Sequence, residues 1–232
     1  VLVILIPLVM GLAIGAFNCV LVAKLKFDYW VVAFASMSIF AGLALVLTNG
    51  VTIPVKNEVL DWIGNGKILG LYVIIWITIL LVGLMVLVQK KTRFGYNVYS
   101  IGGSENVANV SGIKVVKTRI WVYALAGLFA AVAGVAIACM TNSGSPSVGV
   151  EYSFNAMAAV VIGGTSMAGG KGGILGTVFG TVLLRVLASG LSLMGIPATW
   201  QKALIGVVIV TMIVVDVANE HRKNIKGLRR VY

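Results

Sequence analysis

The residues that come nearest to a catalytic motif form one glycine-rich stretch, residues 163–173, which resembles three such motifs and satisfies none of them. A phosphate-binding loop needs a glycine, four further residues and then Gly-Lys-Ser/Thr. Here Thr165 takes the first position and Gly172 follows Lys171. A dinucleotide-binding fingerprint in the same stretch fails at its last glycine, where Leu175 stands. The sequence therefore does not predict nucleotide chemistry in this chain.

Nucleophilic and metal-dependent chemistry lack their residues as well. A nucleophile elbow requires Gly-x-Ser-x-Gly, but the motif around Ser166 ends in Ala168. The single histidine, His221, cannot form a metal site alone, and Cys19 and Cys139 lie separately inside apolar runs. We therefore expect no catalytic residue, no metal site and no cofactor bound by this chain.

The composition indicates that the glycine-rich stretch lies among apolar helices. Of the 232 residues, 59% are hydrophobic and 11% are charged, whereas a soluble domain carries about 25% charged residues. Apolar runs recur along the chain, and a helix of about 20 apolar residues crosses a bilayer. The sequence predicts an all-α, polytopic membrane bundle of six to seven spans that forms one transmembrane domain over residues 1–232. The expected spans are Val1–Val22, Tyr29–Leu47, Ile68–Val88, Ile120–Thr141, Phe154–Ala168, Gly172–Met194 and Trp200–Val217.

The net charge of +11 lies in short segments between the apolar runs. This distribution argues against nucleic-acid binding and follows the positive-inside rule. Placing residues 89–119 in the cytoplasm puts most of the 18 lysines and arginines on that side, including those of a basic cytoplasmic tail at residues 219–232. The loop at residues 142–152 has no lysine or arginine and is expected outside. Because the chain begins within an apolar run too long for a signal peptide, we expect further spans before it.

Small residues recur at every fourth position from the glycine-rich stretch onward: Gly164, Ala168, Gly172, Gly176 and Gly180. Such spacing lets membrane helices approach closely. The run at residues 169–173 is too rich in glycine for a regular helix, so a short or broken helix is expected near residues 154–173. Two interpretations stay open: close packing alone, or packing next to a transport path. The candidate residues for either role are Gly163, Gly164, Thr165, Ser166, Gly169, Gly170 and Gly176.

Two further polar features have local explanations. Residues 106–110 can form a short cytoplasmic helix, with Ser104 as its N-cap, Glu105 at its positive end and Gly112 as its terminator. Arg185 lies inside an expected span, where a charged residue contacts a substrate, snorkels or faces a partner.

Two stretches of this sequence resemble the ribose/galactose/xylose branch of ABC permeases. The first is Tyr99–Val115, with its order Ile-Gly-Gly, Glu and Ser-Gly-Ile, and the second is Ala158–Gly172. The resemblance covers nearly the whole chain. Asn155 stands where family members often have an acidic residue, and the span around Val31–Phe34 lacks the usual threonine, which leaves the sugar open.

The resemblance implies a multi-pass protein of the bacterial inner membrane that imports a monosaccharide, with ribose as the leading candidate. Its partners would be a cytoplasmic ABC ATPase that binds ATP and Mg²⁺, an extracytoplasmic sugar-binding protein, a second permease copy and membrane lipid. The ATPase-coupling residues carried over from the family are Glu105, Asn106, Ala108, Gly112 and Ile113. Asn155 joins the glycine-rich residues as a candidate for the path.

Three alternatives stay open at this point. A secondary transporter or channel would need its own coupling groups, but no acidic residue lies between residues 152 and 215. A membrane enzyme would need a cluster of His, Asp, Glu or Cys, which the spans lack. An importer of the same family with a nucleoside or a furanose signal as its substrate is the third.

Overall fold

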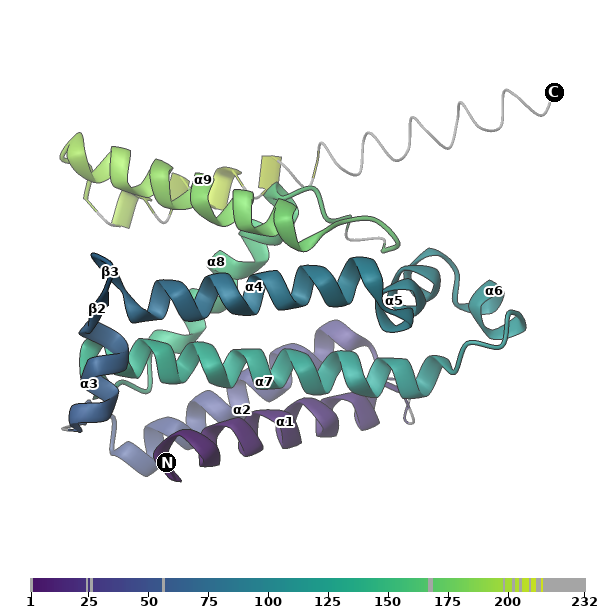
Figure 1. Cartoon of the computed structure of the whole chain (residues 1–232), viewed down its shortest axis with the longest axis horizontal. Coiled ribbons are helices and arrows are strands. Elements are labelled where there is room, and N and C mark those ends of the chain that lie inside the picture. Colours follow the sequence, from purple (N-terminus) through teal and green to yellow (C-terminus); the bar gives the residue numbers. More distant parts are fainter. Residues whose placement is uncertain are drawn as a thin grey trace. The chain divides into compact units, whose positions relative to one another are not determined.

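The computed structural model describes residues 2–23, 25, 27–55, 57–166, 169–197, 199–201, 203–204, 206–208, 210–211 and 214 (Figure 1). It divides into two compact units, residues 1–152 and 153–232, and each is described by itself. Gaps interrupt the last expected span, Trp200–Val217, and the basic tail at residues 219–232 lies outside the described residues.

The described elements are mostly helical. The first unit contains α1 (Leu2–Ala23), α2 (Tyr29–Thr48), β1 (Ile53–Pro54), α3 (Glu58–Asn65), β2 (Lys67–Ile68), β3 (Leu71–Tyr72), α4 (Val73–Lys91), α5 (Arg93–Gly103), α6 (Glu105–Val110), α7 (Val115–Thr141) and β4 (Ser143–Gly144). Helix α8 (Val148–Ile162) runs from the first unit into the second, which also contains α9 (Ile174–Leu193).

Five of the described helices are long and apolar enough to cross a membrane: α1, α2, α4, α7 and α9. Helix α8 is apolar but has only 15 residues, which agrees with the expected short helix. Large apolar side chains point outward from these helices, as Leu80 does with 69% of its surface exposed and Phe179 with 74%. Apolar exteriors of this kind suit a lipid solvent, and the predicted polytopic α-helical membrane bundle is confirmed.

Several expected boundaries were wrong because hydropathy locates membrane depth, whereas helix ends depend on caps and turns. The third span begins at Val73, because residues 67–72 form a β-hairpin instead of the start of a helix. The helix of the fourth expected span, α7, begins at Val115, before the apolar run that starts at Ile120. Helix α8 begins at Val148, within the expected outer loop. Asp28 caps α2 as its sequence allows, accepting a hydrogen bond of 2.8 Å from the Trp30 N–H.

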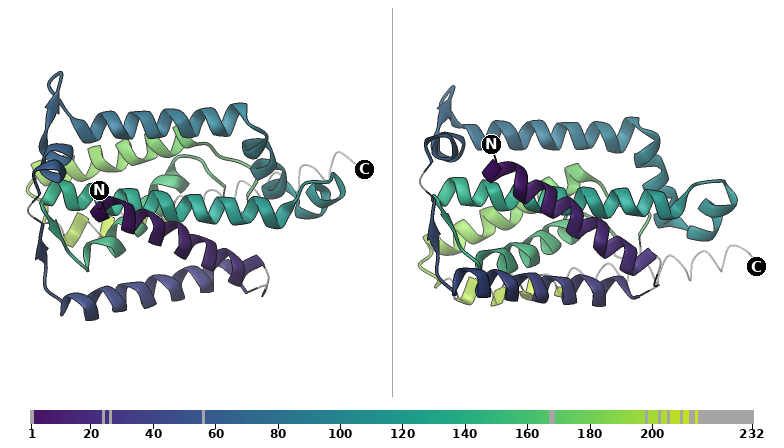
Figure 2. Two further views of the ribbon diagram at one scale, coloured as in Figure 1. Left: turned by 60° about the horizontal axis from the view of Figure 1, so that its bottom comes forward. Right: turned by 90° about the horizontal axis from the view of Figure 1, so that it is seen from below.

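Helices α1 and α7 pack together through glycine. A methyl group added at Gly15 would lie closer than 3.0 Å to the Tyr123 carbonyl oxygen, and one at Gly127 would meet the carbonyl oxygen of Gly11. Both views in Figure 2 show the two helices crossing side by side. Because backbones touch here, the contact has no side-chain layer that could yield, and Cys19 beside it is completely buried.

At the end of this unit opposite α5 and α6, a small cap covers α7 (Figure 1). Strand β1 pairs with β4, matching Ile53 with Gly144. Helix α3 lies on the end of α7, where Gly64 faces the Cys139 carbonyl. The Asp61 carboxylate accepts hydrogen bonds from the side-chain amides of Asn142 (2.9 Å) and Asn65 (2.8 Å). The loop at residues 142–152, which is expected outside, therefore meets the segment between α2 and α4 in one structure.

We expect the attachment of α3 to weaken in acid. Hydrogen bonds from Asn142 and Asn65 to the ionised carboxylate lower the pKa of Asp61 below its usual range. A lowered folded-state pKa stabilises the fold above the unfolded value of about 3.9, and this contribution is lost as the pH falls through the folded-state value. The protection factors of the α3 amides, which are exchange rates corrected for the intrinsic pH dependence, should therefore fall below about pH 4. Asp61→Asn should abolish that pH dependence, and an unchanged profile in this variant would contradict the assignment.

Candidate functional site

The loop between α4 and α7 folds into two helices: α5 follows the end of α4 beside the start of α7, and α6 lies beyond the ends of both (Figure 1). Thr92 caps α5 through a hydrogen bond of 3.3 Å from the Gly95 N–H. Gly95 faces the Gln89 carbonyl so closely that no side chain fits there, and the Gln89 amide donates to the Tyr99 hydroxyl. These contacts fix the corner between α4 and α5 and so determine where α6 lies.

Helix α6 has the caps that the sequence predicts. Ser104 Oγ accepts a hydrogen bond of 3.4 Å from the Val107 N–H, and Glu105 occupies the first turn. After the helix, Gly112 adopts a φ of +78°, and the Ile113 N–H donates to the Ala108 carbonyl at 3.0 Å. Glycine takes this left-handed conformation without the strain of a side chain, so Gly112 ends the helix where the sequence places its terminator.

The two faces of α6 differ in exposure. Ala108 is 2% exposed and holds the helix against the rest of the loop. On the other face Val107 is 65% exposed and Val110 is 91% exposed, while Asn106 and Asn109 are exposed as well. An apolar side chain at the tip of a capped helix, outside any membrane span, has a surface that suits a protein partner.

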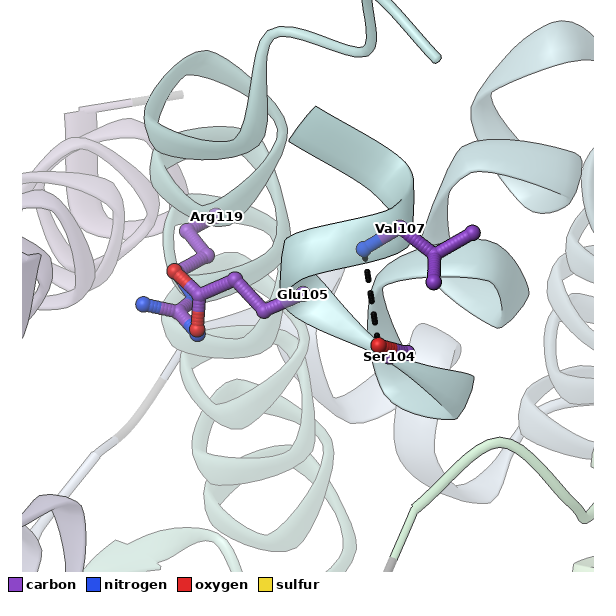
Figure 3. A network of polar contacts seen from close by, with 4 residues as sticks. All are labelled: Ser104, Glu105, Val107 and Arg119. Atoms are coloured by element: carbon purple, nitrogen blue, oxygen red, sulfur yellow. Dashed lines mark hydrogen bonds and ion pairs between the residues drawn. The ribbon is translucent and has the colours of Figure 1, made fainter. Parts of the chain in front are cut away.

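Glu105 also contacts α7, which the sequence did not predict. Its carboxylate Oε2 lies 2.5 Å from Nη2 of Arg119, and Figure 3 shows the two side chains pointing toward each other between α6 and α7. The available signal was that Glu105 is the single acidic residue among the basic residues of the loop at residues 89–119. An ion pair therefore ties the short helix to a membrane span.

The expected orientation predicts from which side of the membrane a cysteine at each end of the helices can be labelled. A cysteine at the exposed position Ser147 should react with an impermeant maleimide in intact cells, and one at Asn109 only in inverted vesicles. Cys19 and Cys139 are buried and give little background. Labelling of Ser147→Cys only after the inner face is opened would overturn this orientation.

The glycine-rich stretch forms the turn between α8 and α9 in the second unit. The Gly164 N–H donates to the Val161 carbonyl at 3.0 Å and the Thr165 N–H to Val160 at 3.2 Å, which ends α8. Ser166 donates its N–H to the Lys171 carbonyl at 3.1 Å and closes the loop. Four glycines of the stretch have positive φ: Gly164, Gly169, Gly170 and Gly172.

Helix α9 returns against α8 through glycines. A methyl group at Gly176 would meet the Gly163 carbonyl oxygen, one at Gly163 would lie 2.6 Å from the Thr177 nitrogen, and one at Gly180 would meet the Ala159 carbonyl oxygen. Gly163 and Gly176 therefore bring the backbones of α8 and α9 close together. Ala158, Ala159 and Leu184 form the buried core between these helices.

The expected segment Phe154–Ala168 ends earlier than predicted, because α8 stops at Ile162. Gly164 and Gly172 lie in the loop with positive φ, whereas Gly176 and Gly180 lie four residues apart on α9. The loop is still compact, because a methyl group at Gly172 would lie 2.6 Å from Thr165 Oγ1. Asn155 lies half-buried on α8. A role of these residues in a transport path stays a prediction.

The residues around α6 and around the turn between α8 and α9 position helices and pack them closely. Among the described residues, no three His, Cys, Asp or Glu side chains gather where they could hold a metal ion. Lys171 lies exposed in the loop after α8. Arg185 lies on α9, as the sequence places it.

A family model described as the permease component of the branched-chain amino acid transport system matches residues 1–213. The ribose import permease RbsC of Escherichia coli K12 is 37% identical over 213 residues, 90% of this chain and 66% of the relative. The probable ABC transporter permease YphD of the same strain is 37% identical over 188 residues, 81% of this chain and 56% of the relative. The arabinose permease AraH is 32% identical over 199 residues, 86% of this chain and 61% of the relative.

The chain thus spans about three fifths of the length of these curated relatives. No solved structure matches it. The five long apolar helices and the relatives agree on a multi-pass protein of the bacterial inner membrane. The predicted resemblance to monosaccharide ABC permeases is confirmed, and the chain belongs to the family of transport-system permease components that the matching model describes.

Proposed function

We propose that this chain forms part of the membrane path of a bacterial ABC importer for a monosaccharide, ribose or a similar sugar. The observation that carries this proposal is the identity of 37% to a ribose import permease over 90% of the chain. The family description mentions branched-chain amino acids. The named ribose and arabinose permeases favour a sugar over an amino acid, a nucleoside or a furanose signal.

A separate ATPase would drive the import, and α6 would be its docking helix. Ala108 anchors this helix inside the loop, while Val107 and Val110 stay exposed for a partner. Glu105 in the first turn, Gly112 after the helix and Ile113, which donates to the Ala108 carbonyl, define its ends, while Asn106 would face the partner from its exposed position. The ion pair with Arg119 would carry a movement of the docked helix into α7.

The path itself would run beside the loop between α8 and α9. Thr165 and Ser166 place hydroxyl groups there, and the positive φ of Gly169 and Gly170 leaves backbone groups without bulky side chains. Sugars are recognised through hydroxyl hydrogen bonds, which such groups provide. A second permease copy would complete the path, and an extracytoplasmic binding protein would deliver the sugar.

An ion-coupled secondary transporter is the second candidate function, and the residue content of the long helices argues against it. Such transporters use acidic residues within the membrane for coupling. None of the five long described helices, α1, α2, α4, α7 and α9, contains aspartate or glutamate. External energy from an ATPase is therefore the better explanation.

The test is uptake of radiolabelled ribose by cells that carry the full-length permease, its ATPase and its binding protein. We expect uptake to need all three, to survive a protonophore while ATP is maintained, and to be inhibited by unlabelled pentoses. Uptake without the ATPase would refute the importer. Inhibition by leucine or by a nucleoside, but not by pentoses, would refute the sugar.

Reversing the charge of Glu105 should uncouple the ATPase. Glu105→Lys places a positive charge at the positive end of α6, which costs about 0.3–1 kcal/mol. It also replaces the ion pair with Arg119, a partly exposed pair of about 0.2–1 kcal/mol, by repulsion. We expect sugar-stimulated ATP hydrolysis and uptake to fall several-fold.

Two variants separate the ion pair from the cap. Glu105→Lys combined with Arg119→Glu should restore part of the coupling, because the pair re-forms with its charges exchanged. Gly112→Val strains the turn after α6 and should uncouple without any change in charge. Intact coupling in both Glu105→Lys and Gly112→Val would contradict the docking role of α6.

A further inference from the structure

The β2–β3 hairpin has an unusual residue at its tip. Ile68 pairs with Leu71, so the two-residue turn consists of Leu69 and Gly70, with φ of +53° and +83°. Such a turn favours asparagine, aspartate or glycine at both places, because other residues are strained at positive φ. Leu69 is nevertheless there, and 87% of its surface is exposed.

Leu69 is therefore unfavourable twice, through its backbone conformation and through its exposed apolar side chain. An asparagine would remove both disadvantages at once. A contact that stabilises an apolar side chain at this tip would explain the leucine, and the described residues do not supply it.

The neighbouring residues indicate what lies against the tip. The Trp76 indole N–H in the first turn of α4 donates to the Ile68 carbonyl at 3.2 Å and fixes the hairpin at the level where this span begins. The Lys67 ammonium lies 5.2 Å from the centre of the Tyr72 ring. Tryptophan, tyrosine and lysine at the end of a span are typical of the membrane–water interface.

The hairpin also points in a direction that suits a place at the membrane–water interface. Both views in Figure 2 place it beyond α4 on the side away from α7. The tip therefore extends sideways from the first unit, and Leu71 in the hairpin and Ile75 and Ile79 on α4 are exposed apolar residues as well.

We propose that the β2–β3 hairpin is a lipid anchor, with Leu69 inserted among the acyl chains just below the headgroups of the outer leaflet. Trp76 and Tyr72 lie at the headgroup level, and the Lys67 ammonium reaches the lipid phosphates. The anchor fixes the depth of α4, and through the corner at Gln89 it fixes the level of α5 on the other side of the membrane.

The depth of a spin label tests the anchor in the full-length permease reconstituted in vesicles of phosphatidylethanolamine and phosphatidylglycerol. A nitroxide on Leu69→Cys should be relaxed more by oxygen, which concentrates in lipid, than by a water-soluble nickel chelate. The matched control on Ser147→Cys, at the same end of the unit, should show the opposite order. A label at Leu69 as accessible to nickel as the one at Ser147 would overturn the anchor.

Two other results would also overturn it. A label shielded from both reagents would mean that protein covers the tip, either a second copy or another part of the permease. A label that becomes shielded only when the sugar-binding protein is added would make the hairpin a docking surface for that protein.

A second variant guards against disturbance by the label itself. Leu69→Asn suits the positive φ, so its unfolding temperature in detergent should equal or exceed that of the unsubstituted permease. In vesicles, a label at Leu71→Cys should move toward water when Leu69→Asn is added. No movement in this pair would show that Leu69 does not hold the hairpin in lipid.

Discussion

Gly176→Leu is expected to abolish transport and to reduce sharply the yield of folded permease. Even a single methyl group at this position would lie within 3.0 Å of the Gly163 carbonyl oxygen, which is backbone and cannot rotate away. Forcing extra methylene groups into a packed contact costs about 1–3 kcal/mol. A leucine adds a whole branched side chain, so we expect a cost above this range. Thermal unfolding in detergent and uptake in vesicles measure the two effects.

The same helix provides the control. Gly190 lies on α9 with nothing within 4 Å of an added methyl group, so Gly190→Leu should leave uptake and yield near their starting level. Leu175→Val, next to the contact on an exposed position, should be mild. Wild-type yield and uptake in Gly176→Leu would show that α8 and α9 do not touch as described.

Gly15→Leu is expected to separate α1 from α7 and to make Cys19 reactive. A methyl group at Gly15 would lie 3.0 Å from the carbonyl carbon of Tyr123 and still closer to its oxygen. Cys19, four residues along α1, is completely buried in the intact structure. Because the helices can only move apart, the thiol should react with maleimide many times faster, as mass spectrometry of the labelled peptide will show.

Gly42→Leu is the matched substitution on α2, where an added methyl group has nothing within 4 Å. It should leave Cys19 protected. Cys139, buried on α7 near Gly64, reports whether damage spreads to the other end of the helix. Equal reactivity of Cys19 in Gly15→Leu and Gly42→Leu would refute a backbone contact between α1 and α7.

Hydropathy predicted the long helices because their solvent is lipid and their apolar length is set by the bilayer. It failed at residues 68–72, where the apolar residues of a hairpin run directly into the apolar span that follows. Only Gly70 indicated the turn, and the leucine before it argued against one. A pattern of apolar residues does not distinguish the start of a helix from a hairpin with apolar residues directly before it.

The candidate site divides in the same way between local and distant interactions. The caps of α6 are predictable because Ser104 and Gly112 act on their immediate neighbours. The spacing of small residues indicated a helix face, but spacing carries no information on the backbone angle φ. The positive φ of Gly164 and the loop around it could therefore not be predicted from this pattern. The contact of Gly15 with Tyr123 joins residues far apart in sequence, and no local pattern indicates such a partner.

Helix α7 has 27 residues and contains no proline. At 1.5 Å per residue it is a rod of about 40 Å, whereas the hydrocarbon core of a bilayer is about 30 Å thick. One end contacts α6 through Arg119, and the other supports α3 at Cys139. A straight rod pivoting by about 5° displaces its far end by roughly 3–4 Å over this length. A small rotation imposed where α7 contacts α6 is therefore delivered beneath α3 as a displacement of atomic size, by leverage alone.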